Sequence, residues 1–179
     1  LMEKAKAKGA QQVEVNASFG HGFTTNVRLS EPEEVVYSHH HAIELTVYFG
    51  KRQGSVSTTD TSETALLQLV DKACAISQFT DEDPCAGLAD KADMATLFPD
   101  LDLYHPWAIT PAEALNIASE CERIALSQHP ALDNSEGAWL ETVESFDCYA
   151  NSHGFFHVEP SSYHSVGVSL IAKKGRDME

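Results

Sequence analysis

Three consecutive histidines, His39, His40 and His41, are the residues whose type and spacing most resemble a metal site. In an extended segment, successive side chains point to opposite faces, so His39 and His41 would share a face and His40 would point away. No further ligand lies nearby in the sequence, whereas zinc sites use three or four protein ligands. We therefore predict that the triplet has a structural role and binds no metal.

The other candidate groups do not assemble into an active site either. A zinc peptidase needs two histidines one helical turn apart with an adjacent glutamate, and the chain has no His-Glu pair in that order. His153 and His157 flank a predicted turn and strand, which would separate them by roughly 13 Å. Glu120 and Glu122 point to opposite sides of a predicted helix, and the acidic run at 81–84 is typical of a solvated loop. Residue chemistry alone predicts no catalytic residue and no metal ligand.

Charge and composition exclude several classes of protein. The 179 residues contain 12 basic and 27 acidic side chains, a net charge of −15, and the longest basic cluster is Lys173–Lys174, so we expect no nucleic-acid partner. No apolar run approaches the roughly 18 residues of a membrane helix, so we expect no membrane partner. The four cysteines lack Cys-x-x-Cys spacing, which favours reduced thiols and a cytoplasmic location.

The N-terminal third reads as a run of strands. Apolar and polar residues alternate over 13–19 and 23–29, and Gly20–His21–Gly22 between them predicts a hairpin turn. Residues 33–49 continue in phase, but one strand of that length would span roughly 56 Å, well beyond common strand lengths. We therefore expect a break at 38–42, which places the histidines at a bend.

Two helices and a long connection occupy the middle of the chain. Ser62 is a predicted N-cap for a helix over 61–79, and Thr110 with Pro111 and Glu113 predicts a capping box for a second helix. Residues 80–109 lack strong periodicity, and their apolar side chains favour a belt over the sheet or an edge that meets a partner or substrate.

Strands return at the end of the chain. A strand leads into the turn Asn151–Ser152–His153–Gly154, and further strands follow, interrupted at Pro160. Separate runs of strands at the two ends predict an α+β fold, in which an antiparallel sheet built from the N- and C-terminal strand runs carries two main helices on one face. We treat residues 1–179 as one domain, and both ends read as cuts in a longer chain, whose C-terminal half is missing.

Several segments resemble the N-terminal half of the TldD/PmbA family, and they look closest to its PmbA branch, also called TldE. The matching segments are TVYFGKRQGSVSTTD (46–60), DPCAGLAD (83–90), FPDLDLYHPW (98–107), NSEG (134–137) and NSHGF (151–155). They occur in order over most of the chain. The pairing of DPCAGLAD with PDLDLY is the most specific of these signals.

The resemblance implies a role in a cytoplasmic TldD/TldE heterodimer that matures or degrades small unfolded peptides. It implies that a zinc site of the His-Glu-x-x-x-His type lies in the TldD-like partner, and that this chain is part of a non-catalytic PmbA/TldE-like subunit with no cofactor of its own. Because the family is described as a modulator of DNA gyrase, it also implies an indirect connection to that enzyme. Two alternatives stay open. The chain is a fragment of a TldD-like subunit with its own catalytic C-terminal half, or it is a gyrase-modulating binding protein without protease activity.

The chain departs from the family pattern in two places. Homologues tend to have an Asn-x-Asp-Gly type turn where this chain has Ser38, the three histidines and Glu44, and they tend to have Arg-His where it has Tyr163–His164. We take the turn Asn151, Ser152, His153 and Gly154, together with His164, as the candidate contact with a peptide or partner.

Overall fold

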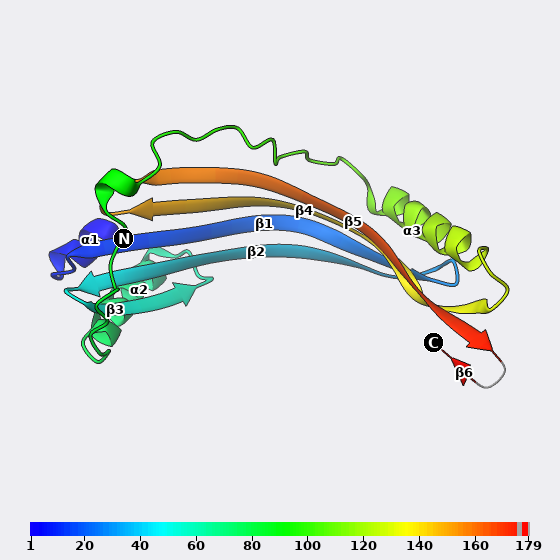
Figure 1. Cartoon of the computed structure of the whole chain (residues 1–179), viewed down its shortest axis with the longest axis horizontal. Helices are drawn as coiled ribbons and strands as arrows, with labels where there is room; N and C mark the ends of the chain where they lie inside the picture. The colour runs from blue at the N-terminus through cyan, green and yellow to red at the C-terminus, as the bar shows by residue number, and fades with distance from the viewer. Residues whose placement is uncertain (175–176, 179) are drawn as a thin grey trace. The chain divides into compact units, whose positions relative to one another are not determined.

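The structure of the chain is a computed structural model that describes residues 1–174 and 177–178. Its helices are α1 (Met2–Ala7), α2 (Glu63–Ser77), the 3₁₀ helix η1 (Lys91–Asp93) and α3 (Pro111–Leu126). Its strands are β1 (Gln12–Arg28), β2 (Glu31–Phe49), β3 (Arg52–Thr58), β4 (Leu132–Asn151), β5 (Phe156–Lys174) and β6 (Asp177–Met178). They form an antiparallel sheet in the order β3-β2-β1-β4-β5-β6, which confirms the predicted α+β fold (Figure 1).

Contacts along the chain divide it into two compact units. The four long strands contribute residues to both of them. The first unit comprises 1–19, 40–102 and 146–160, and the second comprises 20–39, 103–145 and 161–179. The expectation of a single domain stays a prediction.

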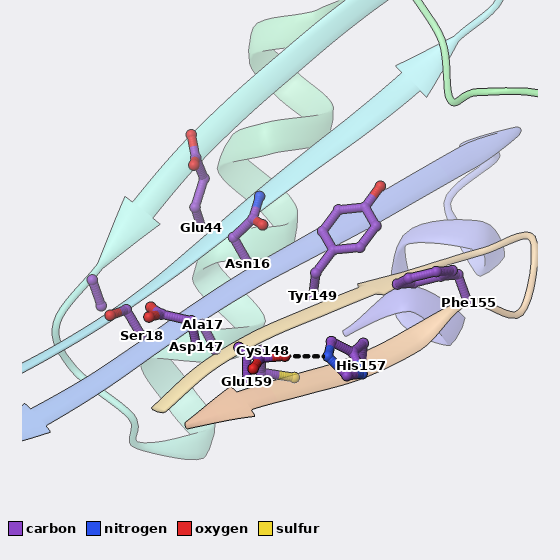
Figure 2. A pocket seen from close by; sticks show the side chains of 11 residues that line it. Asn16, Ala17, Ser18, Glu44, Asp147, Cys148, Tyr149, Phe155, His157 and Glu159 are labelled. Carbon is purple, nitrogen blue, oxygen red and sulfur yellow. Dashed lines mark hydrogen bonds and ion pairs between the residues drawn. The ribbon is translucent and has the colours of Figure 1, made fainter. Parts of the chain in front are cut away.

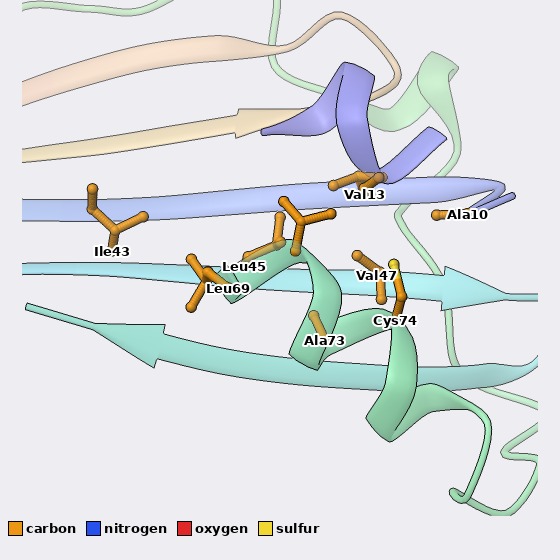
Figure 3. Close-up of a cluster of buried hydrophobic side chains, with 10 residues drawn as sticks. Ala10, Val13, Ile43, Leu45, Val47, Leu69, Ala73 and Cys74 are labelled. Carbon is orange, nitrogen blue, oxygen red and sulfur yellow. The ribbon is translucent and has the colours of Figure 1, made fainter. Parts of the chain in front are cut away.

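The core of the first unit lies between α2 and one face of its strands. Leu45 and Val47 of β2 and Val13 of β1 are fully buried, and Leu69 and Ala73 of α2 pack against them (Figure 3). Burying one such aliphatic side chain stabilises the fold by about 1.5–3 kcal/mol. Because side chains alternate across a strand, the intervening residues of β1 and β2 point to the face that α2 does not cover.

Gly54 of β3 allows α2 to approach the sheet closely. A Cβ atom at this position would lie 2.2 Å from the carbonyl oxygen of Ala73 and 2.7 Å from the amide nitrogen of Ser77. Both atoms belong to the helix backbone, which cannot move aside without shifting the whole helix. Glycine is therefore required at residue 54 by packing.

In the second unit, α3 packs on its part of the sheet through small residues. Ala114 contacts Phe23 and Leu140, and the next turn of the helix places Ala118 against other strand residues, Val27 and Ala138. Both alanines are fully buried. Alanine side chains let the helix backbone lie close to the strands, in keeping with the close packing of protein interiors.

A buried carboxylate of α3 holds the turn between β1 and β2. Glu122 is fully buried, and its two oxygens accept hydrogen bonds from the backbone amides of Leu29 at 3.0 Å and Ser30 at 2.7 Å. Leu29 and Ser30 have φ values of 51° and 65°, as a two-residue type I′ hairpin turn requires, although neither is glycine. Burial by itself would raise the pKa of Glu122, but hydrogen bonds from Ser135, Ser30 and Leu29 outweigh it and hold that pKa below its ordinary value.

Both predicted helix starts are confirmed. The Ser62 hydroxyl accepts a hydrogen bond from the amide of Ala65, and Thr110 and Glu113 form the reciprocal capping box with Pro111 at the first helical position. Across the described part of the chain, no helix combines the length and the apolar character needed to cross a lipid bilayer.

The predicted strand breaks are wrong at three places. β1 continues through Gly20–His21–Gly22, β2 continues through the three histidines, and β5 continues through Pro160. Gly22 is required by packing, because a Cβ there would lie 2.1 Å from the carbonyl oxygen of Thr142. The histidines therefore occupy an exposed stretch of strand and not a bend.

We predict that Gly54→Ala lowers the free energy of unfolding by about 2–3 kcal/mol, because the added methyl group would overlap the α2 backbone. Chemical denaturation monitored by circular dichroism measures the change. Ser57→Ala is the matched control on the same strand, since Ser57 is exposed, and should change stability by less than about 0.5 kcal/mol. Equal stability of both variants would contradict the described packing.

We predict that Glu122→Gln lowers the free energy of unfolding at pH 7 by about 2 kcal/mol, because a neutral amide cannot accept charge-assisted hydrogen bonds from both turn amides. The pKa of Glu122 lies below its ordinary value of 4.5 in the folded chain, so its contribution is complete above pH 4.5 and is lost as the pH falls through the lower, folded pKa. Denaturation from pH 7 to pH 3 should therefore show a smaller loss of stability in the variant. Parallel pH profiles of variant and wild type would refute this role.

Candidate functional site

A cavity of about 500 Å³ opens on the sheet face of the first unit that lies opposite α2. Its lining includes Asn16 and Ser18 of β1, Glu44 of β2, and Asp147 and Tyr149 of β4 (Figure 2). These residues point away from the core because they alternate with the buried positions of the same strands. The cavity is therefore a direct product of a sheet with a helix on only one face in this unit.

The lining carries negative charge. Glu44, Asp147 and Glu159 all line the cavity, and the lining contains no lysine or arginine. The Ser55 hydroxyl donates a hydrogen bond to Glu44 at 2.8 Å, which orients the carboxylate without neutralising it. The site thus offers carboxylates from three different strands to a bound molecule.

One wall of the cavity is held by the long segment between α2 and α3. His157 is hydrogen-bonded through Nε2 to Glu159 at 2.7 Å, and its ring stacks on Phe98 with 4.3 Å between ring centroids. Phe98 also meets Phe155 edge-on at 5.5 Å. The segment therefore fixes the orientation of two cavity residues.

A shared carboxylate holds the other side. Glu14 accepts hydrogen bonds from the hydroxyls of Tyr48 at 2.6 Å and Tyr149 at 2.7 Å. Burial and the neighbouring Glu14 carboxylate raise the pKa of Tyr48, and burial and Glu14 also raise that of Tyr149 against the opposing effect of Asn151. Both phenols therefore stay protonated as donors, which is the form this arrangement needs.

The predicted contact turn is folded into the first unit. Asn151 is buried, and its side-chain oxygen accepts hydrogen bonds from the amides of His153 at 3.0 Å and Phe155 at 3.3 Å. Ser152 pairs with Val13 through its amide and its hydroxyl, and Gly154 has a φ of 96°. The turn Asn151–Gly154 is thus present as expected, and its contact with a peptide or partner stays a prediction.

His164 lies in the second unit, and both of its ring nitrogens are occupied. Nε2 donates to the carbonyl oxygen of His105 at 2.8 Å, and Nδ1 is hydrogen-bonded to the Thr142 hydroxyl at 2.9 Å. Its ring also meets Trp107 edge-on at 5.5 Å. His164 therefore anchors the end of the 80–109 segment to β4 and β5, and its role toward a partner stays a prediction.

The histidine triplet lies on the exposed part of β2. His39 stacks on His21 of β1 with 6.2 Å between ring centroids, a cross-strand pair. Among residues 1–174 and 177–178, no three His, Cys, Asp or Glu side chains are placed to hold a metal ion together. The described residues therefore do not fit a zinc ion of the catalytic type.

The cavity could not be recognised from the sequence. Its lining comes from two strand pairs, β1 with β2 and β4 with β5, that are far apart in the sequence, and the polar residues of each strand taken alone resemble an ordinary solvated face. The only signal was the alternation in 13–19, which placed Asn16 and Ser18 opposite the apolar positions.

Comparison with known proteins shows two adjacent family matches. Residues 13–77 match domain 1 of the PmbA/TldA metallopeptidases, and residues 104–179 match their central domain. The chain is similar to metalloprotease PmbA of Escherichia coli O157:H7, with 36% identity over 178 residues, which is 99% of the chain and 39% of that protein. It is also 37% identical over 164 residues to the PmbA homologue of Haemophilus influenzae, covering 92% of the chain and 36% of that protein. The chain thus spans less than half the length of these relatives.

Solved structures share the fold. A candidate modulator of DNA gyrase from Bacteroides thetaiotaomicron superposes with a TM-score of 0.88 at 20% identity, covering 99% of the chain and 41% of that protein. TldE from Thermococcus kodakarensis superposes with a TM-score of 0.77 at 12% identity, covering 99% of the chain and 39% of that protein. At these identities the likeness concerns the fold alone.

We predict that Asn151→Ala lowers the free energy of unfolding by about 2–3 kcal/mol, because it removes a buried side chain and leaves two partly buried amides of the turn without their acceptor. Asn26→Ala is the matched control, since the Asn26 amide makes an exposed hydrogen bond with Glu34, and it should cost less than about 1 kcal/mol. Thermal or urea denaturation measures both variants. A loss at Asn151 no larger than that at Asn26 would show that the turn does not depend on this side chain.

Proposed function

The chain belongs to the PmbA/TldD metallopeptidase family, and on that premise we propose that it is the N-terminal part of a PmbA/TldE-like subunit that supports peptide hydrolysis without performing it. The observation that supports this proposal most strongly is that several of the chain's carboxylate and imidazole side chains form hydrogen bonds that hold the fold together. Glu122 holds a hairpin turn, Glu14 holds two tyrosines, and His164 anchors a connecting segment. Side chains with such structural roles are those of a scaffold and not of a catalytic site.

In this proposal, catalysis is supplied by a TldD-like partner that carries a zinc site of the His-Glu-x-x-x-His type. The described residues of the present chain provide no fitting ligand set for such a metal, so we derive no catalytic step through it. Its own contribution is to help form the walls of the space in which small unfolded peptides are cleaved. The turn Asn151–Gly154 and His164 remain our candidates for contact with the partner or the peptide.

The open sheet face of the first unit suits this role. An unfolded peptide presents backbone and side chains together, and a polar face with a cavity can receive both. The four cysteines are free thiols, which supports a place in the reducing cytoplasm as part of the proposal. Maturation or degradation of small peptides by a heterodimer is the function that these features favour.

A second candidate is a regulatory protein that acts on DNA gyrase without proteolysis. It is favoured by the description of the Bacteroides relative as a candidate gyrase modulator. A third candidate is a TldD-like subunit whose own C-terminal half is catalytic. Sequencing the remainder of the gene separates the third candidate from the first by the presence of a His-Glu-x-x-x-His motif.

We predict that the full-length protein copurifies with a TldD-like subunit and that the pair cleaves an unfolded peptide only when both are present. Affinity capture followed by mass spectrometry of the peptide products measures this. Removing zinc with a chelator should abolish cleavage while leaving the complex associated, because the metal is held by the partner.

Each alternative gives a distinct result in the same assay. Undiminished cleavage by the TldD-like subunit alone would contradict the supporting role. Cleavage by the present protein alone would favour the third candidate. Inhibition or activation of purified gyrase with no peptide cleavage under any condition would favour the second.

A further inference from the structure

The cavity on the open sheet face of the first unit has the charge of a site for organic cations. Its lining includes Glu44, Asp147 and Glu159 and contains no lysine or arginine. We infer that this cavity binds the basic side chain of a peptide, a lysine or an arginine, and so selects basic segments among the peptides handled by the protein. The inference rests on the proposed function only in naming a peptide as the source of the cation.

The carboxylates suit the head of a basic side chain better than a metal ion. They come from three different strands, β2, β4 and β5 (Figure 2). A metal ion needs its ligands around one point, and no three such side chains within the described residues meet that requirement. An ammonium or guanidinium group has three or five N–H donors and can reach separate acceptors.

The carboxylates remain able to attract a cation. Asp147 is exposed and makes no hydrogen bond or ion pair within the described part of the chain, and Glu44 is hydrogen-bonded only by a neutral hydroxyl, that of Ser55. Glu159 is joined to His157. Negative charges that converge on a partly enclosed space attract an opposite charge more strongly than isolated surface carboxylates do.

The remaining lining suits the alkyl stem of a basic side chain. Ala42, on the same face of β2 as Glu44, leaves room for this stem, and the rings of Tyr149 and Phe155 lie 5.6 Å apart at one side of the cavity. Glu14 fixes Tyr149 by a hydrogen bond, and Phe98 fixes Phe155 edge-on. Aromatic rings held in this way cover methylene groups and attract a cation through their faces.

The test is a titration of the ¹⁵N-labelled 179-residue chain with the capped tripeptide Ac-Ala-Lys-Ala-NH₂ at low ionic strength. We expect saturable shifts of the backbone amides of Cys148 and Tyr149, which line the cavity. The peptides with norleucine or glutamate in place of lysine should bind at least about tenfold more weakly, because they lack the positive charge. Added salt should weaken binding of the lysine peptide.

The double variant Glu44→Gln and Asp147→Asn should weaken binding of the lysine peptide by about tenfold. Both substitutions keep the shape of the side chain, and glutamine keeps the oxygen that accepts from Ser55. The matched control is Asp133→Asn, which removes an exposed charge on β4 outside the cavity and should leave binding unchanged. Circular dichroism spectra that match the wild type establish that the variants are folded.

Three results would overturn the inference: equal binding of the norleucine peptide, unchanged binding in the folded double variant, or an equal loss in the control. Equal affinity for n-butylammonium would overturn its peptide part, because the cavity would then recognise the cation alone. The titration needs neither a partner nor zinc. Its failure would therefore leave the proposed function standing, and failure of the two-subunit cleavage assay would leave this result unaffected.

Discussion

Burial of alternate residues of β1 and β2 beneath α2 is the interaction on which the first unit depends. Val13, Leu45 and Val47 give their side chains to this core, and the contact requires glycine at residue 54, where the helix backbone meets β3. Successive side chains of a strand point to opposite faces of the sheet. Because one half of the side chains of β1 and β2 packs against α2, the other half must point to the opposite face. The cavity and its carboxylates follow from that division.

The opposite face is stabilised by hydrogen bonds and ring contacts instead of an apolar core. Glu14 joins Tyr48 to Tyr149, and Phe98 from the long connection stacks on His157. Such contacts fix side chains in place while the surface stays open to solvent and ligands. The peptide-binding role that we propose requires a face of this kind.

The sequence predicted local features well where a few neighbouring residues decide them. The two helix starts at Ser62 and Thr110, the turn at Asn151, the fold class and the family resemblance were all confirmed. Strand continuity was predicted wrongly, because Gly20–His21–Gly22 has the composition of a turn and because one strand over 33–49 would exceed the usual strand length. The reason for Gly22 lies in β4, about 120 residues further along the chain, where Thr142 leaves no room for a side chain. The long strands pair with neighbours of similar length, and the lengths usual in globular proteins were a poor guide to them.

The cavity could not be predicted for the same physical reason. Glu44 lies about 100 positions before Asp147 and Glu159 in the sequence, and the three meet only when β2, β4 and β5 lie in one sheet. Likewise, in the sequence Glu122 was considered only as a possible partner of Glu120 in a carboxylate pair, which was rejected. In the structure, Glu122 accepts the hydrogen bonds that hold the turn between β1 and β2.

The central claim is that these residues form a scaffold and do not themselves activate water for peptide hydrolysis. Its most direct test is equilibrium dialysis of the purified 179-residue chain against zinc, followed by metal analysis and a peptide-cleavage assay on the same sample. The account predicts that zinc is retained at well below one equivalent and that the peptide stays intact. One tightly held equivalent together with cleavage by the chain alone would contradict it.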